Sequence, residues 1–357
     1  MGEPTRRALR LGIVCHPAYG GSGVVASELG IALATRGHQV HFFSHSLPFR
    51  VPDGIPNTHF HEVEVSSYPV FKYPPYTLSL ATKLLEAHRA ERLDIVHAHY
   101  AIPHTIAAYL FGEMLGGDRP RLITTLHGTD ITLVGIDRSF YEITRFALEK
   151  SDGLTAVSRY LARETAEQFQ PSREVRVIEN FIDGTIYRPD RRSDARRREL
   201  ADPGEALIGH LSNFRPVKRV CDVIRAFYRI QKKVRARLLM MGTGVDLERA
   251  RSLAAELGIS SRVDFLGPIH DVPDVLAQLD LFILPSEYES FGLAALEAMA
   301  CGVPVISTRT GGVPELIEHG VSGYLCEVGD YECMASLAVD LLRTTPRRDA
   351  MRQAARE

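Results

Sequence analysis

The stretch Leu281-Phe-Ile-Leu-Pro-Ser-Glu-Tyr-Glu-Ser-Phe-Gly-Leu-Ala-Ala-Leu-Glu-Ala-Met-Ala-Cys-Gly-Val-Pro-Val-Ile306 decides the fold of this chain. An apolar run ends in Leu-Pro-Ser, a helix-forming segment follows, and Cys-Gly then leads into a second apolar run. This order predicts a strand, a loop, a helix, the end of that helix and the next strand. The loop therefore lies at the carboxyl end of a strand, where open α/β sheets bind ligands.

Two carboxylates in this stretch flank seven residues. Glu289 lies in the predicted loop, and Glu297 lies about a turn and a half into the helix, where it can accept hydrogen bonds from hydroxyls. The residues expected to open the helix are Ser290, Phe291, Gly292 and Leu293. Their free N–H groups and the positive end of the helix dipole suit a phosphate. The stretch predicts a nucleotide-sugar site, and a surface helix with two glutamates is the plainer alternative.

Composition narrows the class of protein. The 357 residues are 45% hydrophobic and 24% charged, with a net charge of −2, which gives no argument for nucleic acid or membrane binding. The basic N-terminus lacks the apolar core of a signal peptide. The cysteines are scattered without CxxC spacing, at Cys15, Cys221, Cys301, Cys326 and Cys333. We therefore expect a reduced, cytoplasmic protein without a structural metal, and a homodimer as its assembly.

Apolar runs alternate with helical patterns twice over, which predicts two parallel-sheet domains. The expected strands of the first sheet are Leu11–Cys15, Gln39–Ser44, His59–Val65, Ile95–His99, Leu122–Leu126, Gly153–Val157 and Val175–Ile178. Those of the second sheet are Leu207–Leu211, Ala236–Met241, Val263–Leu266, Leu281–Leu284 and Val305–Thr308. We expect domains over 1–185 and 186–335, with a terminal helix in 336–357 that packs back toward the first domain. The basic run 187–198 is interpreted as a solvated linker and helix start. The fold class is α/β, with two Rossmann-like domains facing a cleft.

Polar motifs follow several strands of the first domain. Pro17-Ala-Tyr-Gly-Gly-Ser-Gly23 precedes an expected helix over Gly23–Arg36, but its glycines do not match the GxGxxG dinucleotide fingerprint. Ligand binding and a tight strand–helix turn are equally good interpretations of this loop. His97 and His99 share one face of a strand, and structural histidines are favoured there over a metal pair. Tyr100 just beyond that strand is the better candidate for contacting a ligand. His127-Gly-Thr129 follows the next strand. A histidine followed by glycine at a strand end more often faces a cleft than a core.

The second domain repeats this arrangement. Ser212-Asn-Phe-Arg-Pro-Val-Lys-Arg219 follows its first strand, so Arg215 and Lys218 flank a helix start, as a pyrophosphate requires. A solvated basic loop is the competing interpretation. Leu266-Gly-Pro-Ile-His-Asp271 ends another strand and offers backbone to a base edge, whereas Gly242-Thr-Gly244 is interpreted as a turn only.

Together these motifs resemble the retaining GT-B glycosyltransferases of family 4, over essentially the whole chain. The shared elements are Gly20-Gly-Ser-Gly23, His127-Gly-Thr129, Arg215 with Lys218, and the Glu289–Glu297 element with Phe-Gly inside it. Within that family the first half is similar to the enzymes that glycosylate L-malate in bacillithiol biosynthesis. The stretches that carry this similarity include Leu47-Pro-Phe-Arg50, Tyr73-Pro-Pro-Tyr76, His99-Tyr-Ala-Ile-Pro-His104 and Leu126-His-Gly-Thr-Asp-Ile-Thr132.

The resemblance implies transfer of N-acetylglucosamine from UDP-N-acetylglucosamine to L-malate, with retention and without a divalent metal or other cofactor. The implied catalytic residues are His127, Arg215, Lys218 and Glu289. The implied donor contacts are Gly21, Gly23, Asn213, Ile269, Ser290, Phe291, Gly292, Leu293 and Glu297. The implied acceptor contacts are Ser22, Tyr100, Thr129 and Arg145, with Arg50 and Arg138 as alternatives to Arg145. The leaving diphosphate itself would take the malate proton.

Other functions stay open at this point. A family 4 enzyme with inositol phosphate, a lipid or a glycan as acceptor shares the donor motifs, and the Pro-Tyr-rich segment 68–76 suits either a lipid or the lining of an acceptor site. A UDP-N-acetylglucosamine 2-epimerase shares the two-domain fold but not the Glu289–Glu297 signature. A non-catalytic sugar-nucleotide sensor is disfavoured by the full set of polar site residues.

Overall fold

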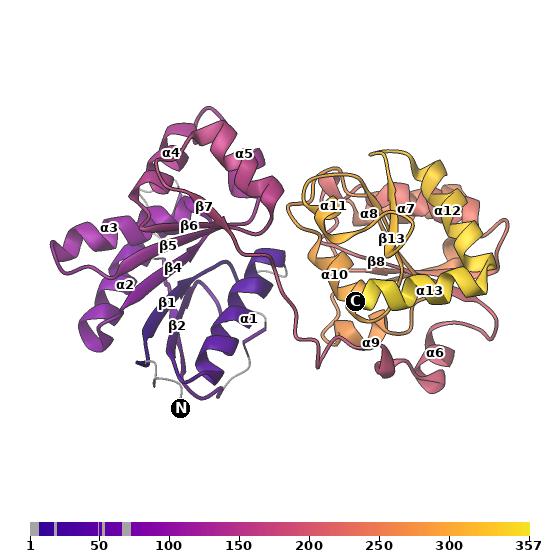
Figure 1. Ribbon diagram of the computed structural model, residues 1–357, viewed down its shortest axis with the longest axis horizontal. Coiled ribbons are helices and arrows are strands. Elements are labelled where there is room, and N and C mark those ends of the chain that lie inside the picture. Colours follow the sequence, from indigo (N-terminus) through magenta and orange to yellow (C-terminus); the bar gives the residue numbers. More distant parts are fainter. Residues whose placement is uncertain (1–6, 18–19, 49, 52–53, 66–72) are drawn as a thin grey trace. The chain divides into compact units, whose positions relative to one another are not determined.

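A computed structural model describes residues 7–17, 20–48, 50–51, 54–65 and 73–357 (Figure 1). The chain divides into two compact units, Met1–Asn180 and Phe181–Glu357. This division falls a few residues before the boundary expected after residue 185, and the segment 336–357 belongs to the second unit. No helix in the described residues has the length and apolar character needed to cross a membrane. Most of the Pro-Tyr-rich segment 68–76 lies outside the described residues.

Within the described residues, seven parallel strands form the sheet of the first unit, in the order β3-β2-β1-β4-β5-β6-β7. The strands are β1(Arg10–Val14), β2(Gln39–Ser44), β3(Thr58–Glu62), β4(Ile95–His99), β5(Arg121–Leu126), β6(Gly153–Ala156) and β7(Val175–Val177). The helices are α1(Gly21–Thr35), α2(Tyr76–Glu91), α3(Ile106–Leu115), α4(Tyr141–Lys150) and α5(Arg159–Phe169), with helical turns η1(Ala101–Thr105) and η2(Thr129–Leu133). The expected strands are all present. The third ends earlier than predicted, because the strand stops pairing with β2 after Glu62.

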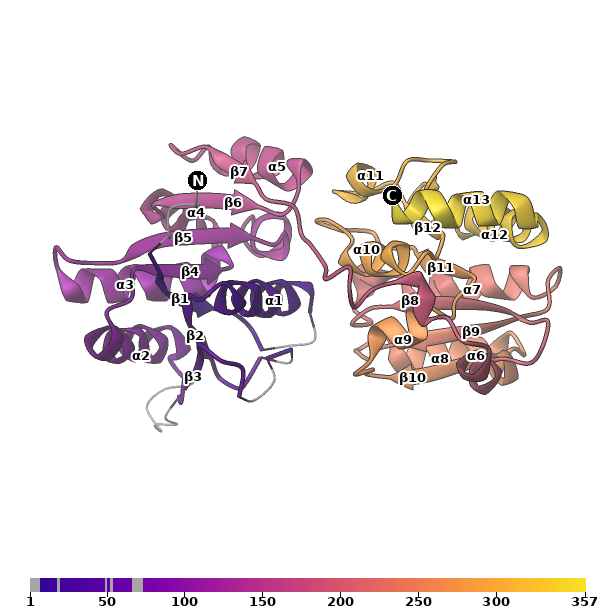
Figure 2. The ribbon, with the colours of Figure 1, turned by 60° about the horizontal axis from the view of Figure 1, so that its bottom comes forward.

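Neighbouring strand residues alternate between two apolar cores, one on each face of this sheet. Val14 and Phe43 pack with α2 and α3, whereas Ile13 and Phe42 pack with α1. Figures 1 and 2 show α1 on the opposite side of the sheet from α2. Because both faces are covered, the central strands are apolar throughout, as is usual for parallel sheets.

The second unit is described throughout, and six parallel strands form its sheet in the order β10-β9-β8-β11-β12-β13. The strands are β8(Ala206–Leu211), β9(Ala236–Met241), β10(Val263–Gly267), β11(Leu281–Leu284), β12(Val305–Thr308) and β13(Gly323–Cys326). The helices are α6(Asp194–Leu200), α7(Val220–Ile230), α8(Leu247–Glu256), α9(Val272–Leu276), α10(Leu293–Ala300), α11(Val313–Leu316), α12(Tyr331–Arg343) and α13(Thr345–Arg356), with short turns η3(Pro189–Arg191), η4(Pro216–Lys218) and η5(Ser260–Arg262). Strand β13 was not predicted, although β11 and β12 of the same length were.

The second sheet is also covered on both faces. Ile208, Met240 and Ile283 pack with α7, α8 and α12, whereas Leu207 and Phe282 pack with α9, α10 and α13. In both units the carboxyl ends of the parallel strands meet at one edge of the sheet, and the loops at that edge carry the predicted site residues.

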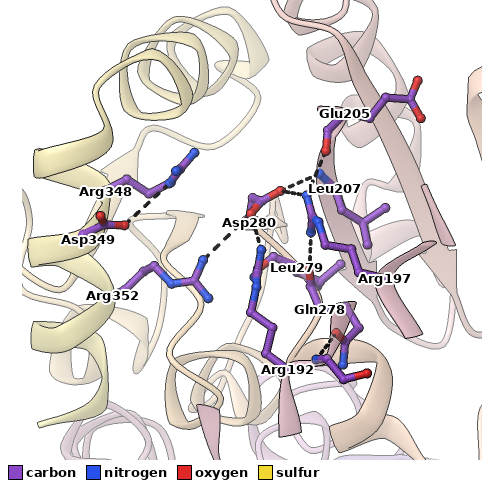
Figure 3. A network of polar contacts seen from close by, with 11 residues as sticks. Arg192, Arg197, Glu205, Leu207, Gln278, Leu279, Asp280, Arg348, Asp349 and Arg352 are labelled. Carbon is purple, nitrogen blue, oxygen red and sulfur yellow. Dashed lines mark hydrogen bonds and ion pairs between the residues drawn. The ribbon is translucent and has the colours of Figure 1, made fainter. Parts of the chain in front are cut away.

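A polar network closes the opposite, amino edge of the second sheet (Figure 3). Asp280, just before β11, accepts hydrogen bonds from Arg192 and from the backbone N–H of Leu207, both at 2.9 Å, and from Arg197 at 2.5 Å. Burial alone would raise the pKa of Asp280, but Arg197, the Leu207 N–H and Arg192 together lower it below its ordinary value. The prediction that 187–198 is a solvated linker was therefore wrong in part, because two of its arginines anchor it to the sheet.

Candidate active site

Lys218 and Glu289 meet at the carboxyl edge of the second sheet. Lys218 ends the turn after β8, and Glu289 lies in the loop after the neighbouring strand β11. Lys218 Nζ lies 2.6 Å from Glu289 Oε1, and Ser286 Oγ donates to the same oxygen at 2.8 Å. The two side chains are 18% and 12% exposed, so the pair is shielded but still reachable from solvent. The two loops meet as expected, and their ligand roles stay predictions.

The loop after β8 is shaped by a buried histidine. His210 Nδ1 donates to the Ile283 carbonyl at 2.9 Å, and its Nε2 accepts from Ser212 Oγ at 2.8 Å. Burial lowers the pKa of His210 to about 4, so the ring is neutral near pH 7. His210 therefore holds the start of the loop as an uncharged group.

Two glycines let a second loop lie directly on this one. A Cβ atom on Gly242 would lie 1.9 Å from the Ser212 carbonyl oxygen, and one on Gly244 would lie 2.1 Å from that of Asn213. Both glycines also have positive φ angles, 111° and 159°. The prediction that Gly242-Thr-Gly244 is only a turn was incomplete, because no larger residue fits against the 212–213 backbone.

Among the described residues, Asn213 has an oxygen without a hydrogen-bond partner and Arg215 has no ion-pair partner. Asn213 Oδ1 is buried and has no hydrogen-bond partner among the described residues. Arg215 is exposed and forms no ion pair within the described part of the chain. A buried acceptor without a partner is unusual in a folded protein, and an exposed guanidinium is well suited to an anion. Both groups are therefore candidates for contact with a ligand.

The Glu289 loop is longer than the sequence predicted. Helix α10 begins at Leu293, not at Ser290, because Gly292 takes the left-handed conformation with φ at 96°. Gly292 O accepts from the N–H groups of Ala295 and Leu296, so the first-turn N–H groups before them have no partner within the helix. The anion seat predicted for Ser290–Leu293 therefore starts at Leu293.

The strand beside β11 holds this loop in place. Thr308 Oγ1 donates to the Ser286 carbonyl at 2.5 Å, and Thr310 Oγ1 donates to that of Glu287 at 2.8 Å. The backbone N–H of Gly312 donates to the Glu289 carbonyl at 3.0 Å. Phe291 is buried, which anchors the end of the loop. The carboxylate of Glu289 is thus presented by a braced backbone.

Glu297 is held by a residue that the sequence did not single out. Its side chain is buried, and Tyr187 donates its hydroxyl to Glu297 Oε1 at 2.6 Å. Tyr187 is itself buried, and Arg356 donates to its carbonyl at 3.1 Å. Glu297 therefore has a defined direction, set from the segment that opens the second unit.

Ile269 follows β10, which is the edge strand of the second sheet. Strand β9 lies between β10 and β8, which precedes Lys218, and the Ile269 side chain packs partly against the α9 core. It lies at the expected edge but not among the charged groups.

In the first unit, Gly21, Ser22 and Gly23 form the first turn of α1. Neither an acidic residue nor a side-chain cap occupies this turn in the described residues, and the first bond of the helix runs from the Val24 N–H to the Gly20 carbonyl. Residues 18–19 of the same motif lie outside the described residues. The turn offers free N–H groups and a hydroxyl, which suits an anion.

Histidines gather where β4 and β5 end. His97 Nε2 lies 2.6 Å from Thr125 Oγ1, and His99 Nδ1 lies 2.9 Å from His127 Nε2. Burial lowers the pKa of His97 to about 4, that of His127 to about 3, and that of His99 well below its ordinary value. These rings are neutral near pH 7, so they form uncharged hydrogen bonds. No group of three or more metal-binding side chains was found among the described residues.

Tyr100 has a strained backbone. Its φ angle is 96°, a region that L-residues seldom adopt, and its N–H donates to the Thr125 carbonyl at 3.0 Å. Its ring stacks on His127, with centroids 5.5 Å apart. Such strain gathers at functional sites, which supports the choice of Tyr100 over the histidines.

Asp130 holds the loops after β4 and β5 together, and the sequence did not predict a role for it. Its carboxylate accepts from the backbone N–H groups of Ala101, His127 and Gly128 at 2.9–3.1 Å, which ties the loops after β4 and β5 together. Burial raises its pKa to about 6, while these N–H bonds oppose the rise. The motif His-Gly-Thr-Asp was visible in the sequence, but the inward direction of Asp130 was not.

The predicted acceptor residues occupy different places. Ser22, Tyr100 and Thr129 follow the adjacent strands β1, β4 and β5. Arg145 lies instead within α4, is 54% exposed and contacts Glu142 at 3.3 Å. Its alternative Arg50 already pairs with Glu28 at 3.3 Å. Ser22, Tyr100 and Thr129 therefore share one edge of the sheet. Arg145 is connected to that edge only because its helix, α4, packs on η1.

Known proteins match both halves of the chain. A model described as "Glycosyltransferase Family 4" matches residues 19–185, and one described as "Glycosyl transferases group 1" matches residues 191–357. The N-acetyl-alpha-D-glucosaminyl L-malate synthase of Bacillus anthracis is 49% identical over 98% of this chain and 91% of its own length. The chain belongs to the family 4 glycosyltransferases.

A further relative is similar over most of the chain, and solved structures show the same fold. The D-inositol 3-phosphate glycosyltransferase of Mycobacterium marinum is 28% identical, over 91% of this chain and 74% of that protein. The crystal structure of Anabaena Alr3699/HepE in complex with UDP and glucose matches with a TM-score of 0.80 at 18% identity, over 98% of this chain and 94% of that one. A glycosyltransferase from Rickettsia africae matches with a TM-score of 0.79 at 20% identity, over 98% and 93%. The predictions of a GT-B architecture and of a glycosyltransferase are confirmed, and the cleft stays a prediction.

Proposed function

We propose that this glycosyltransferase transfers N-acetylglucosamine from UDP-N-acetylglucosamine to the hydroxyl of L-malate, with retention, as the first step of bacillithiol biosynthesis. The observation that carries the donor side is the Lys218–Glu289 pair at 2.6 Å beside the exposed Arg215. The acceptor side is supported by the relative that is 49% identical across both units.

The donor roles follow from charge and position in the second unit. Arg215 and Lys218 would neutralise the diphosphate, and Lys218 would stabilise the charge that develops on it as it leaves. When Lys218 turns from Glu289 to the diphosphate, the Glu289 carboxylate would be free to accept hydrogen bonds from sugar hydroxyls. Glu297, directed by Tyr187, would accept from the ribose diol. Backbone N–H groups from Leu293 onward would face the phosphates.

The acceptor roles belong to the first unit. L-malate carries two carboxylates, so it needs N–H and cationic partners. The first turn of α1 with Ser22 supplies donors, Tyr100 and Thr129 supply hydroxyls at the adjacent strand ends, and Arg145 supplies positive charge. His127 would contact the donor sugar as a neutral ring.

The proton of the malate hydroxyl would go to the leaving diphosphate. The buried histidines nearby are poor bases near pH 7, because burial lowers the pKa of His127 to about 3 and that of His97 to about 4. A diphosphate oxygen released on the same face of the sugar is a better acceptor for this proton than these histidines. We also propose that no divalent metal takes part, since Arg215 and Lys218 supply the charge. Unchanged turnover in EDTA would agree with this.

One assay tests the function. The purified protein is incubated with UDP-N-acetylglucosamine and L-malate, inositol phosphate or other hydroxy acids, and UDP release is followed with product mass. Malate-dependent UDP release and an α-linked product by NMR are expected. If UDP were released with inositol phosphate but not with L-malate, inositol phosphate would be the acceptor. If UDP-N-acetylmannosamine formed without any acceptor, the protein would be an epimerase. The same proposal includes a cytoplasmic homodimer, which cell fractionation and light scattering would test.

A further inference from the structure

Two cysteine sulfurs lie side by side in the second unit, and neither cysteine is among the proposed substrate contacts. Cys326 ends β13 and Cys333 lies in the first turn of α12. Their Sγ atoms are 3.0 Å apart. That is only about 1 Å longer than the roughly 2.05 Å of a disulfide bond. The other cysteines, Cys15, Cys221 and Cys301, have no thiol partner among the described residues.

Both cysteines are held by fixed backbone. Cys326 pairs with Thr308 in the sheet, and its carbonyl accepts from the Arg309 N–H at 2.8 Å. Cys333 is placed by the helix cap, because its N–H donates to the Asp330 side chain at 2.9 Å. The short distance between the sulfurs therefore results from the packing of α12 on β13. Closing the remaining gap requires side-chain rotation and a small backbone shift.

The two thiols differ in access. Cys326 is buried, and burial together with Cys333 raises the pKa of its thiol. Cys333 is partly exposed. An oxidant from solvent would therefore meet Cys333 first, and Cys326 is placed to act second.

The pair also adjoins the loops that brace the donor site. The Cys326 carbonyl holds Arg309, and the next residue, Thr310, donates to the Glu287 carbonyl at 2.8 Å. Glu287 is two residues from Glu289. A shift of Cys326 would thus pass through Arg309 and Thr310, just after β12, to the backbone that presents the Glu289 carboxylate.

We propose that Cys326 and Cys333 form a site of reversible covalent modification, an intrachain disulfide made by exchange with low-molecular-weight disulfides, which lowers glycosyl transfer. The Cys333 thiolate attacks one sulfur of the small disulfide, so a mixed disulfide forms and one small thiolate leaves. The Cys326 thiolate then attacks the Cys333 sulfur, and the second small thiolate leaves. The two protons of the protein thiols end on the two small thiols. One protein dithiol is oxidised and one small disulfide is reduced to two thiols.

The chain allows a direct test. No lysine or arginine lies between Arg309 and Arg343, so both cysteines fall in the tryptic peptide 310–343. The native protein is treated with oxidised glutathione, alkylated and digested. We expect this peptide to lose two hydrogen atoms in mass and to take up no alkyl group, and to regain two alkylation sites after dithiothreitol. A peptide that stays fully alkylated after treatment of the native protein would overturn the proposal.

Single variants assign the order of attack. Cys326→Ser should keep a glutathione adduct on Cys333, whereas Cys333→Ser should form little adduct on the buried Cys326. Equal adducts in both variants would contradict the order. Cys221→Ser is the matched control, because Cys221 is also a buried thiol of this unit but has no thiol partner among the described residues, and the variant should form the disulfide like the wild type.

The effect on catalysis is measured in the same samples. We expect kcat/KM to fall by roughly tenfold in the oxidised protein and to recover on reduction, since small displacements of catalytic groups have effects of this size. Cys326→Ser can form the glutathione adduct on Cys333 but not the intrachain disulfide, so its kcat/KM should not change on oxidation. If the disulfide is seen by mass and kcat/KM is unchanged, the proposal that the disulfide lowers glycosyl transfer is refuted. The mass readout is independent of the acceptor, so failure of the malate proposal leaves it intact.

Discussion

The ammonium nitrogen of Lys218 lies 2.6 Å from a carboxylate oxygen of Glu289, so the donor edge of the second unit is already ion-paired. A buried or partly buried pair has little net effect on stability, and removal of one partner leaves a charge without compensation. Under the proposed function, an incoming diphosphate would offer Lys218 a stronger anion and would release Glu289 toward the sugar. The pair would then connect occupation of the phosphate site with the state of the carboxylate.

Lys218→Met tests this connection through catalysis. We expect kcat to fall by about 10²-fold, because a positive charge placed at the leaving group acts mainly in the transition state. The measurement is UDP release at saturating donor and acceptor. Lys232→Met, in the turn after α7, is the matched control and should leave kcat unchanged. An increase in donor KM with kcat intact would assign Lys218 to ground-state binding only.

Tyr187→Phe tests the direction of Glu297. Loss of the 2.6 Å hydrogen bond should raise the KM for UDP-N-acetylglucosamine by roughly tenfold, since a hydrogen bond to a charged group contributes about 1.5 kcal/mol or more. The KM for L-malate should not move. Tyr228→Phe removes a hydroxyl elsewhere on the same unit and serves as control. If donor KM is unaltered in Tyr187→Phe, the hydrogen bond has no role in binding.

Arg145→Ala tests the acceptor assignment. We expect the KM for L-malate to rise by about tenfold, while the donor Kd changes little, because a guanidinium pairs with the acceptor carboxylates and not with the donor. Arg138→Ala is the competing variant. An unchanged malate KM in Arg145→Ala, with an increase in Arg138→Ala, would transfer the role to Arg138.

Asp280→Asn tests the network at the amino edge. We expect the free energy of unfolding to fall by roughly 3 kcal/mol at pH 7, because Arg192 and Arg197 lose their buried partner. The pKa of Asp280 is lowered in the folded protein, so its contribution is present above the unfolded value of about 4 and is lost as pH falls further. Urea unfolding at several pH values measures both effects. Asp340→Asn, in an exposed pair with Arg347, should change stability little.

Acid should weaken the first unit before it affects Asp280. The pKa values of His97, His104 and His127 are lowered from 6.5 to about 4, 3 and 3, because the rings are buried. As pH falls below 6.5, the unfolded chain binds protons that the folded chain does not, so stability decreases toward pH 4. Asp130, with a raised pKa, acts in the opposite direction, but it is one group against several. Calorimetry should show the first unit melting at lower temperature across this range, and a constant melting temperature would contradict it.

The sequence was a good guide to whatever depends on strand order. Lys218 and Glu289 follow strands that both precede helices, and their loops had to meet if those strands were neighbours, as β8 and β11 are. The left-handed Gly292 was harder to foresee, because Ser-Phe-Gly-Leu is equally compatible with an earlier helix start.

Contacts between segments that are far apart in the chain could not be predicted from the sequence. Tyr187 and Glu297 are separated by 110 positions, and nothing in a polar, arginine-rich segment indicates that its tyrosine turns inward. Asp130 was visible in a motif, but three backbone N–H groups around one carboxylate is a property of folded loops. Such residues are found only when the backbone of two or more loops is known.

Arg356 near the end of α13 donates to the carbonyls of Gly184, Tyr187 and Ala300, at 3.3, 3.1 and 3.0 Å. The point where the chain enters the second unit and its last helix are therefore neighbours. One guanidinium thus joins the segment that opens the second unit, helix α13 and the last residue of α10, so a displacement of any one of the three is transmitted to the other two.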